Sequence, residues 1–149
     1  LISQIDDFMT KLTKIQPYII RKRGEEKPLD EGEYLQTPAE LARFKPYSMC
    51  INCMLCYAAC PVYALDSTFI GPAAIALGQR YNMDSRDHGR DARQELIASH
   101  EGIWECTFVG ECSAVCPKDV DPAAAIQRAK VSSTIDWFKD VLIPWGKKK

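Results

Sequence analysis

Residues 50–61 read CINCMLCYAACP, which places four cysteines at the spacing CxxCxxCxxxC with a proline directly after the last one. Residues 106–117, CTFVGECSAVCP, repeat this frame with Val109 at the second cysteine position. All seven cysteines of the 149-residue chain belong to these two segments: Cys50, Cys53, Cys56, Cys60, Cys106, Cys112 and Cys116. The two segments are therefore an internal repeat in which the second copy lacks one cysteine.

The odd number and close spacing of these cysteines argue against a disulfide framework. One cysteine would stay unpaired, and three thiols at CxxCxxC spacing lie too close together to pair separately with distant partners without strain. Metal ligation in a reduced compartment fits the pattern better. Zinc favours tetrahedral sets built from separated CxxC pairs, so this spacing disfavours zinc, and buried structural cysteines fit it less well still.

The CxxCxxCxxxCP run is the spacing with which bacterial ferredoxins bind iron–sulfur clusters. Three closely spaced thiolates hold one cluster, and the fourth cysteine turns away toward the other cluster. This crossed ligation predicts two ligand sets: Cys50, Cys53, Cys56 and Cys116 at one centre, and Cys60, Cys106 and Cys112 at the other. Four thiolates predict a [4Fe-4S] cluster. Three thiolates beside Val109 predict a [3Fe-4S] cluster, although water or hydroxide could hold a fourth, labile iron at that corner.

Charge and composition exclude several other functions. The net charge is −1, and the sequence shows no basic stripe of the kind that nucleic acids require. No stretch reaches the roughly 20 apolar residues of a membrane span, and no secretory signal is recognisable. The one basic run, 147–149, is expected to be a solvated tail. The two histidines, His88 and His100, lie in polar surroundings and are expected at the surface rather than among the ligands.

Apolar periodicity and capping residues predict an all-α fold with two cysteine-rich loops, because no run alternates as a strand does. The charged stretch 21–36 is expected to be an exposed loop. Helices are predicted at about 1–18, at a capping box formed by Thr37, Pro38 and Glu40, at 72–81, at 91–99, and from Asp121 and Pro122 to Phe138 through a weak middle at 131–134.

Four stretches carry a resemblance to a known family: KIQPYII (14–20), SMCINCMLCYAACP (48–61), FIGPAAIALGQRYNMDSRDHG (69–89) and CTFVGECSAVCPKDVDPAAAIQRAK (106–130). Together they resemble the C-terminal, helical ferredoxin domain of the iron–sulfur subunit of fumarate reductases and succinate dehydrogenases, over essentially all of residues 1–149. CTFVGEC is similar to the fumarate reductase branch, since dehydrogenase members more often carry histidine where this chain has Thr107.

The resemblance implies an electron-transfer subunit of a membrane-associated quinol:fumarate reductase used in anaerobic respiration. Its partners would be a flavoprotein subunit, membrane-anchor subunits and menaquinone or ubiquinone, at the cytoplasmic face of the inner membrane. The family's carriers run from flavin through [2Fe-2S], [4Fe-4S] and [3Fe-4S] to quinone, and its ligand sets coincide with those predicted from the repeat. The [2Fe-2S] motif of the family's N-terminal half is absent from this sequence, and Leu1 stands where a start methionine would. We therefore expect a piece of a longer polypeptide.

By position, Gln127 and Lys130 match polar residues that line the family's quinone pocket, and Thr107 and Phe108 are weaker candidates. Judged by its sequence alone, Lys130 is as readily a solvated helix residue. Pro144 and Trp145 could lie at a headgroup surface or simply pack on the domain. Two other functions stay open: a free soluble ferredoxin-like carrier without a fixed enzyme, and a structural metal module that docks partners.

Overall fold

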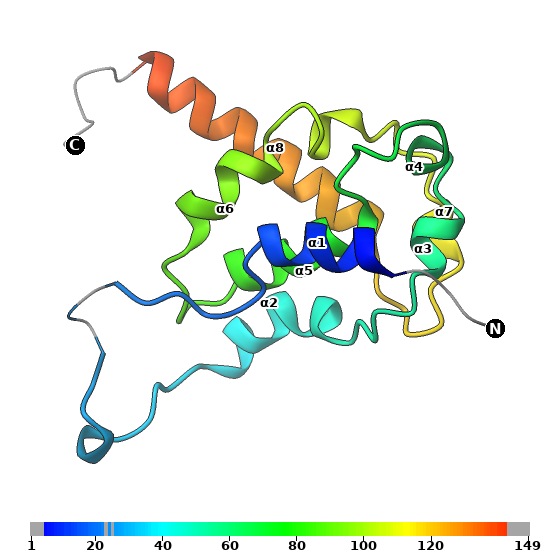
Figure 1. The fold of residues 1–149 in the computed structure, drawn as a ribbon. Coiled ribbons are helices and arrows are strands. Elements are labelled where there is room, and N and C mark those ends of the chain that lie inside the picture. The colour runs from blue at the N-terminus through cyan, green and yellow to red at the C-terminus, as the bar shows by residue number, and fades with distance from the viewer. Residues whose placement is uncertain (1–4, 23, 25, 143–149) are drawn as a thin grey trace.

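A computed structural model describes residues 5–22, 24 and 26–142, and Figure 1 shows their arrangement. In this part of the chain all regular structure is helical, which confirms the predicted all-α class. The α-helices are α1 (Asp6–Lys14), α2 (Pro38–Ser48), α3 (Leu55–Ala58), α4 (Pro61–Leu65), α5 (Pro72–Asn82), α6 (Arg90–Ile97), α7 (Glu111–Ala114) and α8 (Pro122–Leu142), with 3-10 turns η1 (Leu29–Glu31) and η2 (Ile103–Glu105).

Helix α5 is the centre of the fold and packs against α1, α2, α3, α6 and α8. Its first half is almost entirely buried because its side chains are small, which lets neighbouring helices approach closely. Gly78 shows how close this approach is, since a Cβ there would lie 2.8 Å from the Ile15 side chain and 2.9 Å from that of Ile97.

The predicted starts of α2, α5 and α8 are confirmed and α6 begins one residue early, whereas the helix predicted from residue 1 begins only at Asp6 in the described residues. The Thr37 side chain accepts a hydrogen bond from the main-chain amide of Glu40 at 3.2 Å, and the Glu40 carboxylate accepts one from the Thr37 amide at 2.8 Å. Asp121 caps α8 by accepting a hydrogen bond from the Ala124 amide at 2.9 Å. These side chains satisfy amides that the first turn of a helix leaves without partners.

Two predicted helix ends are wrong. Helix α1 stops at Lys14 instead of near Tyr18, because Pro17 disfavours helical geometry at the residue before it, and Gln16 takes a positive φ of 53°. Helix α8 continues past Phe138 to Leu142. Its weak middle is held from outside, since Arg90 donates to the Ser132 hydroxyl at 2.8 Å and Gln94 donates to that of Ser133.

The structure also shows the predicted loop at 21–36 and the two histidines, whereas the predicted terminal features lie outside the described residues. The loop at 21–36 contains only the short turn η1 in its described residues. Both histidines are exposed, as predicted. Leu1, Pro144, Trp145 and 147–149 lie outside the described residues.

A buried ion pair fixes the segment after α1 to α6. Arg93 and Asp87 are joined at 2.7 Å, with side chains 0% and 1% exposed. Arg93 also donates to the carbonyl oxygens of Gln16 and Tyr18 at 3.0 and 2.6 Å. Because these bonds join residues far apart in sequence, they fix the segment after α1 against α6. This contact lies at the end of the molecule opposite the cysteine loops, which gather with α3, α4 and α7 (Figure 1).

Candidate functional site

The two cysteine loops have the same backbone conformation. Equivalent positions are 56 residues apart, from Cys50 to Cys106. Asn52 and its counterpart Phe108 both have positive φ, at 56° and 59°. Met54, with φ 63°, precedes α3, and Gly110, with φ 90°, precedes α7 at the equivalent position.

Equivalent hydrogen bonds close both loops. The Tyr57 amide donates to the Met54 carbonyl oxygen at 3.0 Å, and the Ser113 amide donates to that of Gly110 at the same distance. The Val109 loop therefore keeps the fold of the Cys53 loop, and the valine stands at the position of Cys53 without rearranging the loop around it.

Each loop lines its own hollow, and the two hollows divide the cysteines into a set of four and a set of three. The first hollow, of about 410 Å³ including its open mouth, is lined by Cys50, Cys53, Cys56 and Cys116. The second, of about 340 Å³, is lined by Cys60, Cys106 and Cys112, with Val109 beside them. In each hollow, one of the cysteines comes from the other loop. The structure thus brings together the two sets of side chains that the crossed ligation predicts.

The N-terminal turns of α5 and α8 lie between the hollows. Pro72 and Ala123 line the second hollow, whereas Ala73, Ala76 and Pro122 line the first. Their small or ring-shaped side chains leave room for a bound group. The N-terminus of a helix carries partial positive charge, so these turns favour an anionic group in either hollow.

Burial opposes ionisation of the thiols. Burial, followed by the neighbouring thiolates of Cys50, Cys112, Cys53 and Cys116, raises the pKa of Cys56 to about 12. Burial also raises the pKa of Cys50 and of Cys112. Thiolates crowded in this way need a compensating positive charge, which bound iron provides.

Main-chain amides point at the sulfur atoms of the second set. The amide of Phe108 donates to Cys106 Sγ at 3.4 Å, and the amide of Tyr63 donates to Cys60 Sγ at 3.5 Å. Hydrogen bonds of this kind stabilise negative charge on sulfur and raise the reduction potential of a cluster bound there.

The donor set fits iron–sulfur clusters. None of the seven cysteines, all of which lie within the described ranges, forms a disulfide. Thiolate ligands select iron–sulfur clusters, zinc or copper(I). Over residues 5–22, 24 and 26–142, no three His, Cys, Asp or Glu side chains come together as they would around a single metal ion.

Lys130 lies on α8 next to the second cysteine set, and Gln127 lies one turn earlier on the same helix. The Lys130 ammonium donates to the Cys106 carbonyl oxygen at 2.8 Å and lies 5.9 Å from the centre of the Trp104 ring. Gln127 Nε2 is buried without a hydrogen-bond partner in the structure. Thr107 and Phe108 line the second hollow itself. Trp104 was missed by sequence reasoning, although its place two residues before Cys106 was a usable signal.

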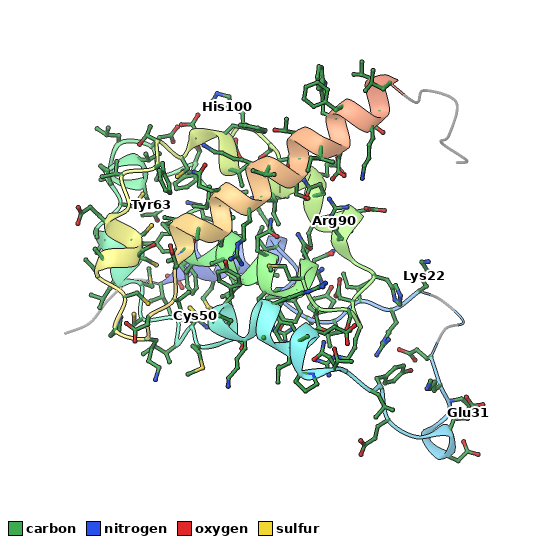
Figure 2. The ribbon with its side chains drawn as sticks, turned by 180° about the vertical axis from the view of Figure 1, so that it is seen from behind. Lys22, Glu31, Cys50, Tyr63, Arg90 and His100 are labelled. Atoms are coloured by element: carbon green, nitrogen blue, oxygen red, sulfur yellow. The ribbon has the colours of Figure 1, made fainter. Side chains whose placement is uncertain are left out.

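The sequence analysis also missed a cluster of charged and aromatic side chains around Tyr63, whose amide donates to Cys60 Sγ. The Tyr63 hydroxyl donates to Asp7 at 2.6 Å, which raises the pKa of Tyr63 to about 12. Lys11, only 8% exposed, pairs with Asp7 at 2.7 Å and lies 4.5 Å from the centre of the Tyr63 ring. The ring of Tyr63 packs edge-on against Tyr57, with ring centres 4.8 Å apart. Cys50 and Tyr63 are labelled at the same end of the molecule in Figure 2, far from Lys22 and Glu31.

Residues 46–120 match the family model described as the 4Fe-4S dicluster domain, a range that contains both cysteine segments. The chain belongs to this family. The domain accounts for the two thiol-lined hollows, because a dicluster domain binds two iron–sulfur clusters.

Curated relatives extend the similarity beyond the matched range. The chain is 59% identical to the fumarate reductase iron–sulfur subunit of Mycobacterium tuberculosis over 98% of this chain and 58% of that protein. It is 52% identical to the subunit of the same name from Escherichia coli O6:H1 over 97% and 58%, and 32% identical to the succinate dehydrogenase iron–sulfur subunit of Coxiella burnetii over 87% and 54%. The chain therefore spans a little more than half the length of these relatives.

In the part of the chain that the structure describes, no helix combines the length and the apolar character needed to cross a membrane.

Proposed function

We propose that the chain is the electron-transfer iron–sulfur subunit, or the helical part of it, of a membrane-associated quinol:fumarate reductase. It would carry electrons between quinone and a flavoprotein subunit. The observation that carries this proposal is the division of the seven thiols between two adjacent hollows, four in one and three beside Val109 in the other. Identity of 59% to a fumarate reductase iron–sulfur subunit supports it.

In this proposal Cys50, Cys53, Cys56 and Cys116 hold a [4Fe-4S] cluster, and Cys60, Cys106 and Cys112 hold a [3Fe-4S] cluster. When bound, such clusters supply one-electron redox chemistry. The conformation shared by the two cysteine loops supports the three-iron assignment, because it leaves the Val109 side chain where a fourth thiolate would stand. The residues of the chain bind the clusters, exclude water and direct amides at sulfur.

The quinone would approach the second hollow along α8. Gln127 supports this placement because its buried amide nitrogen lacks a partner, and an unpaired buried donor is costly unless a ligand accepts its hydrogen bond. Lys130 would supply a second donor and positive charge. Thr107 and Phe108, at the rim of the same hollow, would contact the quinone less directly.

The proposed partners are a flavoprotein subunit, which binds fumarate, and membrane-anchor subunits that hold the complex at the cytoplasmic face of the inner membrane. Residues 1–149 would act as one helical cluster-binding module. The family's [2Fe-2S] motif, which is absent from these residues, would be supplied by another part of the assembly.

A free ferredoxin-like carrier would share only the CxxCxxCxxxCP spacing, and the similarity to iron–sulfur subunits of fumarate reductase and succinate dehydrogenase argues against it. Affinity purification of the protein from its native membrane decides between them. Stable co-purification of a flavoprotein supports the subunit assignment, whereas recovery of the chain alone in the soluble fraction supports the free carrier.

Electron paramagnetic resonance with iron and labile-sulfide analysis tests the cluster assignment. Anaerobic protein should give a near-isotropic signal when oxidised that disappears on reduction, with about seven irons per chain from one four-iron and one three-iron cluster. Two four-iron signals would show that a ligand other than cysteine binds a fourth iron at the second cluster, next to Val109. Zinc without sulfide would leave a structural metal module as the remaining function.

A further inference from the structure

Helix α4 has few attachments of its own to the rest of the protein. It is five residues long, and none of its residues is buried. A helix this short is not stable by itself, so its position depends on the contacts of its side chains. Cys60 caps its first turn, since Cys60 Sγ accepts the hydrogen bond from the Tyr63 amide at 3.5 Å. Contacts that hold Tyr63 therefore also hold an amide against a cysteine of the second set.

Helix α1 holds the side chain of Tyr63. The Tyr63 hydroxyl donates to the Asp7 carboxylate at 2.6 Å. The Lys11 ammonium pairs with the same carboxylate at 2.7 Å and lies over the Tyr63 ring, 4.5 Å from its centre. Lys11 also donates to the carbonyl oxygen of Ser67, just after α4 ends. Two side chains of α1 thus fix α4 at its middle and just beyond its end.

The polar character of this attachment gives it a direction. Lys11 is only 8% exposed, and apolar side chains in these positions would anchor α4 with a smaller desolvation cost. Hydrogen bonds, however, depend on angle as well as distance. The bond to Asp7 therefore fixes the rotation of the Tyr63 side chain, and with it the direction of the main-chain amide of the same residue.

The first cysteine set lacks this arrangement. Cys116 is the counterpart of Cys60, and Asp119 is the counterpart of Tyr63, each 56 positions further along the chain. Residues 117–121, all of which are described, contain no helix in the place of α4. Asp119 has a positive φ of 53°, and its amide donates to the Cys116 carbonyl oxygen at 3.3 Å rather than to sulfur. The contact between Tyr63 and Cys60 therefore distinguishes the set of three cysteines from the set of four.

We propose that Asp7 and Lys11 are positioning residues for the second centre. By holding the Tyr63 ring they keep the amide of the same residue donating to Cys60 Sγ, and this hydrogen bond raises the reduction potential of the cluster that Cys60 joins. A hydrogen bond to sulfur stabilises the reduced, more negative state of a cluster more than the oxidised state. Because the first centre lacks this contact, α1 adjusts the difference in potential that drives electrons between the two centres. The inference rests on the proposed function in requiring that both cysteine sets hold redox-active clusters.

Potentiometric titration of the intact, anaerobically prepared protein, followed by electron paramagnetic resonance, measures the two centres separately. The double variant Asp7→Ala/Lys11→Met removes one negative and one positive charge, so it keeps the net charge while both ties to Tyr63 are lost. It should shift the one-electron equilibrium of the second centre about tenfold toward the oxidised form, or about 59 mV, and leave the first centre unchanged. Tyr63→Phe, which keeps the ring and both charges, should shift the second centre about threefold, or about 28 mV.

Asp6→Ala/Lys14→Met is the matched control, because it removes the same two charges from exposed positions of α1 and should shift neither centre. Iron and labile-sulfide content with circular dichroism shows whether each variant keeps its clusters and its fold. If the double variant loses its clusters, the result of Tyr63→Phe decides, since that change removes only a hydroxyl group.

Unchanged potentials in Tyr63→Phe with both clusters intact would overturn the inference and leave the proposed function standing. Equal shifts of both centres would also overturn it, because they would show a general change in the electric field of the protein. Wild-type protein without iron and sulfide would refute the proposed function, and this inference with it.

Discussion

The ammonium group of Lys130 donates a hydrogen bond to the main-chain carbonyl oxygen of Cys106 at 2.8 Å. This bond places a positive charge directly beside a residue of the second cysteine set. A cation at this position favours the reduced, more negative state of a cluster held by Cys106.

Replacing this cation should therefore lower the reduction potential of the proposed three-iron centre. We expect Lys130→Met to lower it by on the order of 60 mV, which is about a tenfold change in a one-electron equilibrium. Potentiometric titration followed by electron paramagnetic resonance measures the shift. Lys139→Met removes a lysine further along the same helix and should change the potential little. Equal shifts in both variants would contradict a local effect of Lys130.

Val109→Cys should convert the proposed three-iron centre into a [4Fe-4S] cluster and lower its reduction potential. The loop already has the conformation of its four-cysteine counterpart, with Phe108 at φ 59° where Asn52 has 56°. A thiol at position 109 therefore needs no backbone movement to reach the hollow. The near-isotropic signal of the oxidised protein should disappear, and the iron content should rise by about one per chain. Val109→Ala, which adds no ligand, should keep the signal; a free thiol at 109 with the signal unchanged would contradict the prediction.

The cysteine sets and helix caps could be predicted because both depend on short-range patterns. Spacing within each loop, together with the crossed ligation that this spacing shows in ferredoxins, predicted which thiols lie around each hollow, and the residues Thr37-Pro38-Ala39-Glu40 predicted the start of α2. Ligand spacing and capping are set within one or two turns of backbone, so they are readable in the sequence.

The parts that could not be predicted depend on contacts between distant residues. Lys11 is buried because its ammonium meets Asp7, the Tyr63 ring and the carbonyl oxygen of Ser67, which lies 56 positions away. The side of α8 that faces the protein likewise follows from Arg90 and Gln94, which belong to another helix. No local pattern indicates which face of a helix meets such a partner, because tertiary packing decides it.

Gly71→Ala should destabilise the protein more strongly than Gly32→Ala. Both glycines have backbone angles that other residues rarely adopt, with φ of 97° and 92°. A Cβ at Gly71 would lie 2.1 Å from a carbon of the Tyr57 ring, whereas one at Gly32 has nothing within 4 Å. We expect a loss of about 3 kcal/mol or more at Gly71, from overpacking added to strain. Denaturant unfolding compares the variants, and equal losses would contradict the role of the Tyr57 contact.

The pKa of Asp87 predicts a pH-dependent contribution to stability. Burial works against its charged form, but hydrogen bonds from Arg93 and from the amides of Ile20 and Gly89 outweigh it and lower the pKa of Asp87. The folded protein therefore binds this proton less tightly than the unfolded chain does. The stabilisation is fully present above the unfolded pKa of about 3.9 and is lost as the pH falls through the lower, folded value.

Asp87→Asn should cost about 3–5 kcal/mol at pH 7, since it leaves Arg93 buried without its partner charge, and that cost should shrink below about pH 4. Unfolding curves of both proteins at several pH values measure the difference. Asp30→Asn on the exposed loop is the control, with an expected change within about 0.5 kcal/mol. A cost that stayed constant down to pH 3 would show that Asp87 stabilises the fold by its shape rather than by its charge.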